Sequence, residues 1–296
     1  MVAAESLAAT AGRARAALLA DIARGRPRAA PPAVVLPELA SYAARGYIAA
    51  TLDNRYHGER ACAGLEDSGG GGGADRVSGG GGSGNCYQRA IIRAWRGESG
   101  ERPLLLDNAW DYIHLLDILE ASPDVDARRI GMGGISLGGM ITWLVAAADE
   151  RVSVAAPAIG IQGWGWALKN DSWQARLASL GEVGPAAAAD MGKAAPDAAV
   201  AEALLRKLMP GLLDEYDTRT SLLAIAPRPF LAINGALDAR CPLPGVQQAL
   251  AAAAAEGYAA ADAAEGALQL RSFEGVGHEY TPAMAAAAAE WFEEWL

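Results

Sequence analysis

Short apolar runs alternate with stretches of helical periodicity along most of the chain. Most of these runs are continuously apolar, which is the pattern of central parallel strands buried on both faces. They predict strands at residues 33–36, 48–53, 129–134, 153–160, 229–236 and 268–274. Between them, helices are predicted over residues 38–45, 108–121, 138–149, 245–256 and 282–296.

The predicted helix over residues 108–121 shows the periodicity most clearly. Its apolar positions form one stripe, made of Ala109, Tyr112, Ile113, Leu116 and Leu119. Asp107 precedes the stripe and is the candidate N-cap. Because strands and helices alternate, right-handed βαβ units follow, and the predicted fold class is α/β with a doubly wound, mostly parallel sheet.

Two segments interrupt this alternation. Residues 69–84 contain ten glycines and little that can pack, so they are predicted to form a disordered surface loop without a site. Residues 162–222 hold three tryptophans and an Ala-rich helical stretch near 186–208, which predicts a cap-like helical insertion above the carboxyl ends of the strands. With residues 1–32 as an N-terminal helical extension, residues 1–296 are predicted to form one domain.

The charge of the chain narrows the class of partner. Its 296 residues include 25 Lys and Arg against 35 Asp and Glu, which gives a formal net charge of -10. An acidic chain lacks the basic face that nucleic acid or an anionic membrane requires, so neither is expected as a partner. No run of 18 or more bulky apolar residues occurs, so no transmembrane helix is expected. The sequence gives no indication of oligomeric state.

The cysteines and the N-terminal segment bear on location. Cys62, Cys86 and Cys241 are too few and too scattered for a disulfide framework or a zinc site, so a reducing compartment and a cytoplasmic location are expected. The N-terminus lacks the pattern of a secretory signal. Residues 7–23 are predicted to be an amphipathic surface helix. An organellar transit peptide is the alternative, since five arginines and few acids occur before residue 29.

Residues 134–138 read G-I-S-L-G, a G-x-S-x-G pattern placed directly after a predicted strand and before a predicted helix. In that setting a sharp turn strains the serine backbone and exposes its Oγ at the sheet edge. The dipole of the following helix favours a developing anion there. Ser136 is therefore the candidate nucleophile, and a glycine-rich turn with an incidental serine is the alternative interpretation.

A nucleophilic serine needs a base and an orienting acid. His278 ends the glycine-rich segment 275–278 after the last predicted strand, from which it can reach a serine at a neighbouring strand end. His114 lies inside a predicted helix, one turn from Trp110, and is expected to be structural. His57 is expected to support its loop or line the pocket. Asp238 follows the strand at 229–236 and is the candidate acid that orients the base.

The order Ser136, Asp238, His278 is the nucleophile, acid, base order of α/β-hydrolases. The chain resembles the dienelactone-hydrolase and prolyl-oligopeptidase-like group of that superfamily over roughly residues 33–296, apart from the Gly-rich loop. The matching stretches are 46–60, with its D-x-R-Y-H-G block, 126–140, 225–229, 234–242 and 275–278. The resemblance implies an α/β-hydrolase domain with these three residues as its catalytic triad. There is no room for a β-propeller, so an esterase-like activity on small acyl esters is the closer analogy.

The chain departs from that group at the oxyanion hole. A loop between the first strand and helix, usually His-Gly-rich, supplies one donor in the group, whereas here residues 33–36 run straight into Pro37. Proline has no N–H, so Pro37 cannot replace that donor. The backbone N–H of Leu137 remains available. One missing donor costs about 3–4 kcal/mol of transition-state stabilisation, or roughly 10²–10³ in rate.

The predicted function is that of a serine hydrolase acting on small acyl esters through an acyl-enzyme, with no cofactor and no metal. The shortened loop motivates one alternative, a catalytically weak or inactive ligand-binding protein. An acyltransferase with the same triad is another. His57, Trp164 and Trp166 are the candidates for lining the substrate pocket, and Trp173 lines it or fastens the insertion to the core.

Two further expectations concern residues near the predicted site. Asp53 and Arg55 are expected to form a structural ion pair beside it. Cys241 is expected to be a small packed thiol rather than a nucleophile, since only Arg240 beside it is basic.

Overall fold

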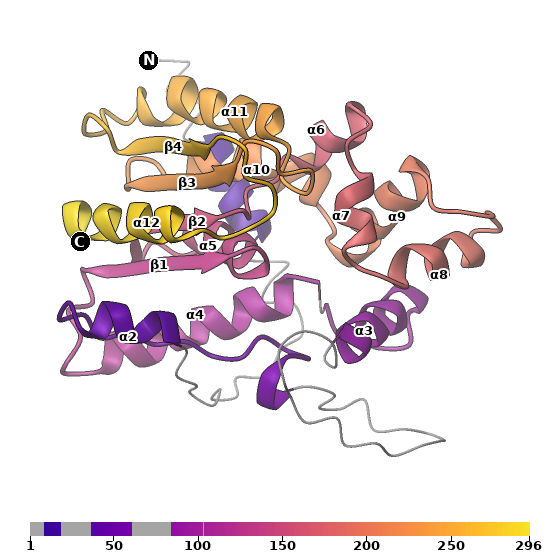
Figure 1. The fold of residues 1–296 in the computed structure, drawn as a ribbon, viewed down its shortest axis with the longest axis horizontal. Helices are drawn as coiled ribbons and strands as arrows, with labels where there is room; N and C mark the ends of the chain where they lie inside the picture. The colour runs from indigo at the N-terminus through magenta and orange to yellow at the C-terminus, as the bar shows by residue number, and fades with distance from the viewer. Residues whose placement is uncertain (1–8, 19–36, 61–83, 103) are drawn as a thin grey trace.

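The computed structural model describes residues 9–18, 37–60, 84–102 and 104–296. The predicted strand at 33–36 and nearly all of the Gly-rich loop lie outside these ranges. In the described part, four parallel strands form one sheet in the order β1-β2-β3-β4. They are β1 (Ile130–Ile135), β2 (Val152–Ala158), β3 (Phe230–Gly235) and β4 (Leu268–Phe273), each at a predicted position. Figure 1 shows them stacked from β4 at the top to β1 at the bottom.

Both faces of the sheet are buried, as the continuous apolar runs predict. Along β3, Phe230 and Ala232 face one hydrophobic core, whereas Leu231 and Ile233 face the other. Helix α5 (Leu137–Ala148) packs on the first face and α12 (Pro282–Trp295) on the second. Figure 1 shows α12 lying in front of the sheet, along the direction of the strands. Helices on both faces of a parallel sheet make the doubly wound α/β architecture that was predicted.

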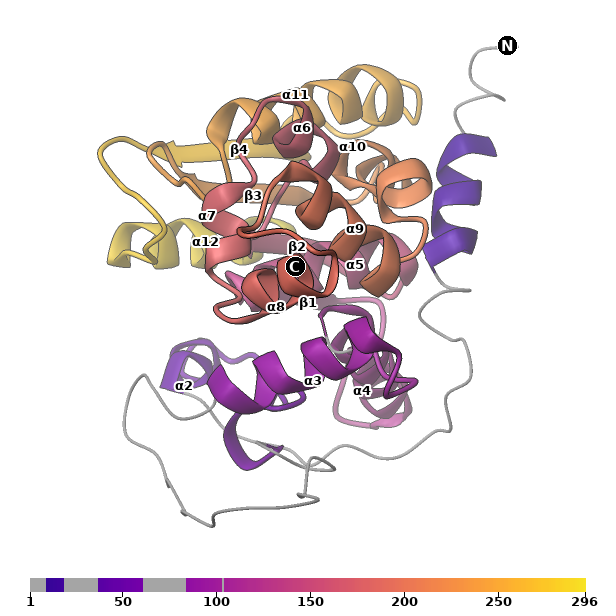
Figure 2. The same cartoon turned by 90° about the vertical axis from the view of Figure 1, so that its right-hand side faces the viewer.

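Helices also fill the chain between β2 and β3. They are α6 (Trp164–Lys169), α7 (Gln174–Ala178), α8 (Val183–Asp190), α9 (Ala198–Leu208) and α10 (Thr218–Ser221). Figure 1 shows α6 to α9 gathered beyond the arrowheads of the strands, and Figure 2 shows α7, α8 and α9 in front of the strands when that end faces the viewer. These helices therefore lie where a ligand above the carboxyl ends of the strands would be enclosed.

The Ala-rich stretch predicted to be helical near residues 186–208 is helical but interrupted. The segment forms two helices, because Gly192 adopts a left-handed backbone with a φ of 70°. Asp197 then caps the second helix by accepting a hydrogen bond from the N–H of Val200. An alanine-rich composition favours helix throughout, but the glycine and the cap divide it.

The strand predicted at residues 48–53 is wrong, since the segment has no regular secondary structure. Ile48 is 60% exposed and Leu52 is buried, so the run does not pack on two faces. Asp107 is likewise not an N-cap. Helix α4 (Leu106–Ala121) begins one residue before it, and the Asp107 carboxylate accepts the N–H of Arg102 instead.

The other helices mostly follow the pattern. Predicted helices at residues 38–45 and 245–256 correspond to α2 (Pro37–Ala43) and to α11 (Leu243–Ala252), which continues as a π-helix (Ala253–Tyr258). Helix α3 (Gly84–Arg96) was not predicted. None of the helices in the described ranges is long and apolar enough to cross a membrane.

Cys86, on α3, is disulfide-bonded, whereas Cys241 is a free and buried thiol. Disulfides persist mainly in oxidising surroundings. A single bond is not a disulfide framework, and the compartment expected from the cysteine count stays a prediction.

Candidate active site

Ser136 stands at the sharp turn between β1 and α5. Its φ of 53° and ψ of -107° lie outside the helical and extended regions, so the turn holds a strained backbone. The Ser136 N–H donates to the carbonyl of Ala158 on β2, at 2.9 Å, which ties the turn to the neighbouring strand. The turn thus presents the serine at the carboxyl end of the sheet.

Glycines allow the close approaches that this turn needs. A Cβ on Gly134 would lie 2.5 Å from the backbone of Gly138, and a Cβ on Gly139 would lie 2.6 Å from the carbonyl oxygen of Ala158. Gly138 itself has open space around its Cα. The second glycine that packing requires is therefore Gly139, one residue beyond the G-x-S-x-G pattern.

The loops after β3 and β4 are held together by their backbones. The N–H of Leu237 donates to the carbonyl of Val276 at 2.8 Å. A Cβ on Gly235 would lie 2.3 Å from the carbonyl oxygen of Gly277, so only glycine permits this approach. This contact fixes the spacing between the loop that carries Asp238 and the loop that carries His278.

The three side chains form one chain of hydrogen bonds. The distance between Ser136 Oγ and His278 Nε2 is 2.7 Å, and the distance between His278 Nδ1 and Asp238 Oδ2 is 2.8 Å. Asp238 is 2% exposed. Its other oxygen, Oδ1, accepts the backbone N–H groups of Arg240 and Cys241 at 2.8 and 3.0 Å. The structure therefore brings together all three residues that the sequence singled out as nucleophile, acid and base.

The surroundings of Asp238 favour its charged form. Burial alone raises the pKa of this carboxyl, but the hydrogen bond and charge of His278 and the N–H groups of Cys241 and Arg240 outweigh burial and hold the pKa below its ordinary value. A carboxylate that stays ionised can orient a neighbouring imidazole and stabilise its protonated form.

This lowered pKa predicts how stability depends on pH. An Asp that titrates lower in the folded chain than in the unfolded one, where its pKa is about 3.9, stabilises the fold at higher pH. That contribution is lost as the pH falls through the folded-state pKa. We expect the difference in unfolding free energy between wild type and Asp238→Asn to shrink on acidification from about pH 5 to 3, below the ordinary range of histidine. Denaturant titrations across this range measure it, and a difference that grows instead would contradict the lowered pKa.

The oxyanion donor predicted at Leu137 sits at the first position of α5. N–H groups in the first turn of a helix have no acceptor within the helix, so this N–H is free to face a developing anion. The loop that supplies a second donor in the group that the chain resembles is expected to be missing after residue 36, and residues 33–36 before it lie outside the described ranges. Helix α2 begins at Pro37, the residue that lacks an N–H.

Asp238, Cys241 and His278 place three metal-ligand atoms within 4.8 Å of one another. Both ring nitrogens of His278 are already engaged by Ser136 and Asp238. Burial raises the pKa of the Cys241 thiol to about 12, and its Sγ donates to the carbonyl of Ile159. Cysteine binds a metal as a thiolate, and histidine binds one through a ring nitrogen that makes no other bond. These three side chains therefore suit a chain of hydrogen bonds better than a metal site.

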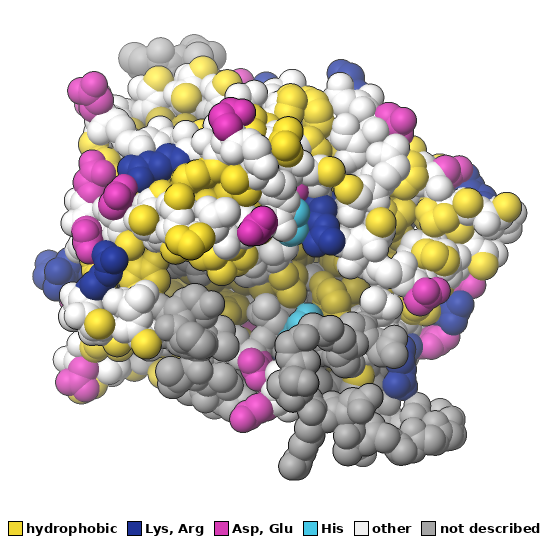
Figure 3. All heavy atoms as spheres, viewed as in Figure 1, with side chains coloured by type: hydrophobic (Ala, Val, Ile, Leu, Met, Phe, Trp, Pro, Cys, Tyr) yellow, Lys and Arg dark blue, Asp and Glu magenta, His cyan; other side chains and the backbone are white. Residues whose placement is uncertain are grey.

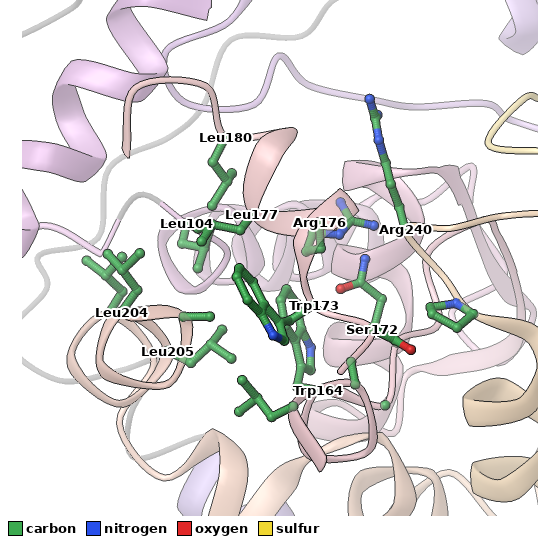
Figure 4. Close-up of a pocket in the computed structure, with 17 residues that line it drawn as sticks. Leu104, Trp164, Ser172, Trp173, Arg176, Leu177, Leu180, Leu204, Leu205 and Arg240 are labelled. Carbon is green, nitrogen blue, oxygen red and sulfur yellow. The ribbon is translucent and has the colours of Figure 1, made fainter. Parts of the chain in front are cut away.

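A small pocket of about 40 Å³, partly open to solvent, lies beside the loop that carries Asp238. Its lining includes Trp164 and Trp173 from the helices after β2, and Arg240 and Pro242 from the loop that carries Asp238. Figure 4 shows leucines on one side of the two indole rings and Arg176 on the other. On the molecular surface, histidine side chains border the hollow at the centre of the face in Figure 3.

The other two pocket candidates do not line this pocket. Trp166 packs against the backbone of Gly163 and Gly245 instead. The Nδ1 of His57 lies 2.9 Å from the carbonyl of Arg55, and its ring centroid lies 4.8 Å from that of Tyr87. His57 thus supports its own loop, and a role for it or for Trp166 toward a ligand stays a prediction.

Two more sequence expectations can be compared with the structure. His114 is buried and packs edge-on against Trp110 at 4.3 Å, as expected of a structural residue. The ion pair expected between Asp53 and Arg55 is wrong. Arg55 forms a bidentate pair with Asp111 on α4 at 2.7 and 2.9 Å, because that carboxylate matches the guanidinium fork. The Asp53 carboxylate instead accepts the N–H of Glu59.

Sequence reasoning missed Arg176, a buried residue of α7 that lines the pocket. In sequence it follows two polar or small residues in a short amphipathic stretch, and nothing there marks it as buried. Only the fold of α7 against the loop after β3 places it near the site.

Comparisons with known proteins bear on the fold. No family model matches the chain. The curated Bacillus subtilis (strain 168) protein named "Putative hydrolase YtaP" is 40% identical over 45 residues, which is 15% of this chain and 15% of that protein. So short a match leaves the activity of the whole chain to be argued from its site.

Solved structures match over a larger part of the chain. Acetyl xylan esterase 1 from Thermoanaerobacterium sp. JW/SL YS485 is 19% identical with a TM-score of 0.54, and the match covers 90% of this chain and 72% of that one. A glucuronoyl esterase from Solibacter usitatus is 16% identical with a TM-score of 0.44, over 62% of this chain and 47% of that one. The first likeness confirms the predicted fold, which is that of the α/β-hydrolases.

Proposed function

We propose that this chain, which has the α/β-hydrolase fold, is a serine esterase that hydrolyses small acyl esters through an acyl-enzyme. The observation that carries the proposal is the hydrogen-bond chain from Ser136 through His278 to Asp238, with distances of 2.7 and 2.8 Å. A serine with a base in hydrogen-bond reach, itself oriented by a carboxylate, is the arrangement that activates a hydroxyl as a nucleophile.

The proposed reaction has two halves, acylation of Ser136 and hydrolysis of the acyl-enzyme, and the same side chains act in both. Ser136 Oγ attacks the ester carbonyl while His278 Nε2 takes the hydroxyl proton, and the Leu137 N–H donates to the oxyanion. When the carbon–oxygen bond to the alcohol breaks, His278 returns the proton to the leaving alcohol. Water then attacks the acyl-enzyme with His278 again as base, which releases the acid and restores Ser136. Asp238 holds the imidazole in the required tautomer throughout.

The names of similar proteins agree with an ester as substrate. The structure with a TM-score of 0.54 is named an acetyl xylan esterase, and the short sequence match is to a protein named as a hydrolase. A short acyl group such as acetyl is consistent with the small-acyl substrate proposed here.

The test is covalent labelling of the intact protein with a fluorophosphonate probe, followed by mass spectrometry. We expect one adduct, on Ser136, and none in Ser136→Ala. Ser272→Ala is the matched control, because Ser272 is exposed on β4 and should leave the labelling unchanged. An unlabelled folded protein that also fails to cleave p-nitrophenyl acetate would refute the proposal.

One structural feature favours a second candidate, a weak catalyst or ligand-binding protein on the same scaffold. Helix α2 begins at Pro37, so the chain after residue 36 offers no donor loop before the helix. Loss of one oxyanion donor lowers the rate by roughly 10²–10³. Slow labelling of Ser136 together with tight binding of a small ligand without turnover would favour this candidate.

A further inference from the structure

Among the residues that the structure describes, Arg176 has no partner of opposite charge within ion-pair distance, although it is buried. It is 9% exposed, and its Nε makes no hydrogen bond although it is shielded from solvent. Within the described residues, the one hydrogen bond of its guanidinium joins Nη2 to the thiol sulfur of Cys241 at 3.6 Å. A guanidinium offers five N–H donors, and burying it unpaired is costly, so an unmatched one calls for a ligand that completes it.

The position of Arg176 connects it with the proposed active site. The Cys241 sulfur that it touches lies within 4.8 Å of the ligand atoms of Asp238 and His278. Arg176 also lines the pocket beside these residues, which is otherwise mostly apolar. Figure 4 shows its guanidinium next to the indole rings, whereas that of Arg240 extends away from them. A ligand beside the indole rings would therefore meet the positive charge of Arg176.

We propose that Arg176 binds a carboxylate of the substrate, so that the preferred substrates are esters whose acyl or alcohol half carries a carboxylate group. This inference rests on the serine esterase function proposed above, because it assigns the substrate class of that site. The planar fork of a guanidinium matches the two oxygens of a carboxylate, and a single negative charge balances it.

Two physical observations support a bound anion rather than a structural role. Burial and the like charge of Arg240 lower the pKa of Arg176, and Cys241 and Asp238 offset this only in part, so the charged form is disfavoured in the free protein. The chain as a whole carries a net charge of -10. The net negative charge of the protein repels anions from most of its surface. An anionic ligand would therefore bind only where a local positive charge, such as that of Arg176, outweighs this repulsion.

The kinetic test uses two matched pairs of esters on the full chain. Mono-p-nitrophenyl adipate against p-nitrophenyl heptanoate places the carboxylate on the acyl side. 3-Acetoxybenzoate against its methyl ester places it on the alcohol side. We expect a kcat/KM preference for one anionic ester of roughly 10- to 100-fold, and Arg176→Met should remove that preference. No preference in wild type for either anion, or a preference that survives in Arg176→Met, would overturn the proposal.

Arg219→Met is the control, because Arg219 is exposed and pairs with Glu256 away from the pocket lining. It should retain the preference. If the folded wild type hydrolyses no ester at all, the esterase proposal fails. A binding measurement then tests the carboxylate site independently of catalysis. Calorimetry on Ser136→Ala should detect adipate or 3-hydroxybenzoate binding that is lost in Ser136→Ala/Arg176→Met. Absence of binding to both anions would refute the carboxylate site.

Thermal unfolding separates a ligand site from a structural role. Replacing an unpaired buried cation with an apolar side chain of similar length removes a desolvation cost, so Arg176→Met should unfold at the same temperature as wild type or a few degrees higher, about 2–4 °C. A marked fall in the unfolding temperature would show that Arg176 supports the fold and would count against the proposal. Arg176→Lys, which keeps the charge without the fork, should retain part of the preference.

Discussion

His278→Ala should lower kcat for p-nitrophenyl acetate by roughly 10⁵- to 10⁶-fold, with KM little changed. The imidazole is the group that lies 2.7 Å from Ser136 Oγ, so its removal leaves the hydroxyl without a proton acceptor at hydrogen-bond distance. The cavity it leaves lies at the surface end of the site, where the side chain is 14% exposed. Added imidazole can enter such a cavity, and it should restore part of the rate.

Steady-state kinetics on His278→Ala and His57→Ala compares the two histidines that lie on loops. His57→Ala should keep kcat within about tenfold of wild type, because the His57 ring contacts Tyr87 and the Arg55 carbonyl and belongs to its own loop. If His57→Ala lost as much activity as His278→Ala, the base would be misassigned. If His278→Ala kept most of its activity, the hydrogen-bond chain would have no catalytic role.

The site was predictable from sequence because its parts are local. Ser136, Asp238 and His278 each lie within a few residues of the end of a strand, and the strands are parallel. The carboxyl ends of parallel strands lie at one edge of a sheet, so three local patterns suffice to place three distant residues together. Gly134 and Gly235 also mark these turns in the sequence, because only glycine permits the close backbone approaches found there.

Two of the errors concern contacts between elements that are distant in sequence. Asp53 is the nearest acid to Arg55 along the chain, but Asp111 on α4 binds it, and no periodicity predicts which helix lies opposite a loop. Arg176 is polar and was not expected in a buried pocket. Helix α3 could have been found, since its buried residues Cys86, Ala90 and Ile91 lie four and five apart, but it follows a glycine run that suggested a loop.

Asp238→Asn tests the electrostatic part of the site rather than its shape. The asparagine amide is nearly isosteric, so its oxygen can still accept the N–H groups of Arg240 and Cys241. What it loses is the charge, and with it the preference for a proton on His278 Nδ1. An NH₂ group facing Nδ1 favours the opposite tautomer, with the proton on Nε2, where it cannot accept the proton of Ser136.

We therefore expect Asp238→Asn to fold and to lose about 10⁴-fold in kcat, a smaller loss than for His278→Ala. Fluorophosphonate labelling of Ser136 should slow by a similar factor, because labelling and hydrolysis need the same activated hydroxyl. Asp262→Asn, an exposed Asp, is the control and should match wild type. A loss of less than tenfold would mean that the 2.8 Å contact between Asp238 and His278 orients nothing that the reaction needs. The hydroxyl of Ser136 would then owe its reactivity to the strained turn and the end of α5 alone.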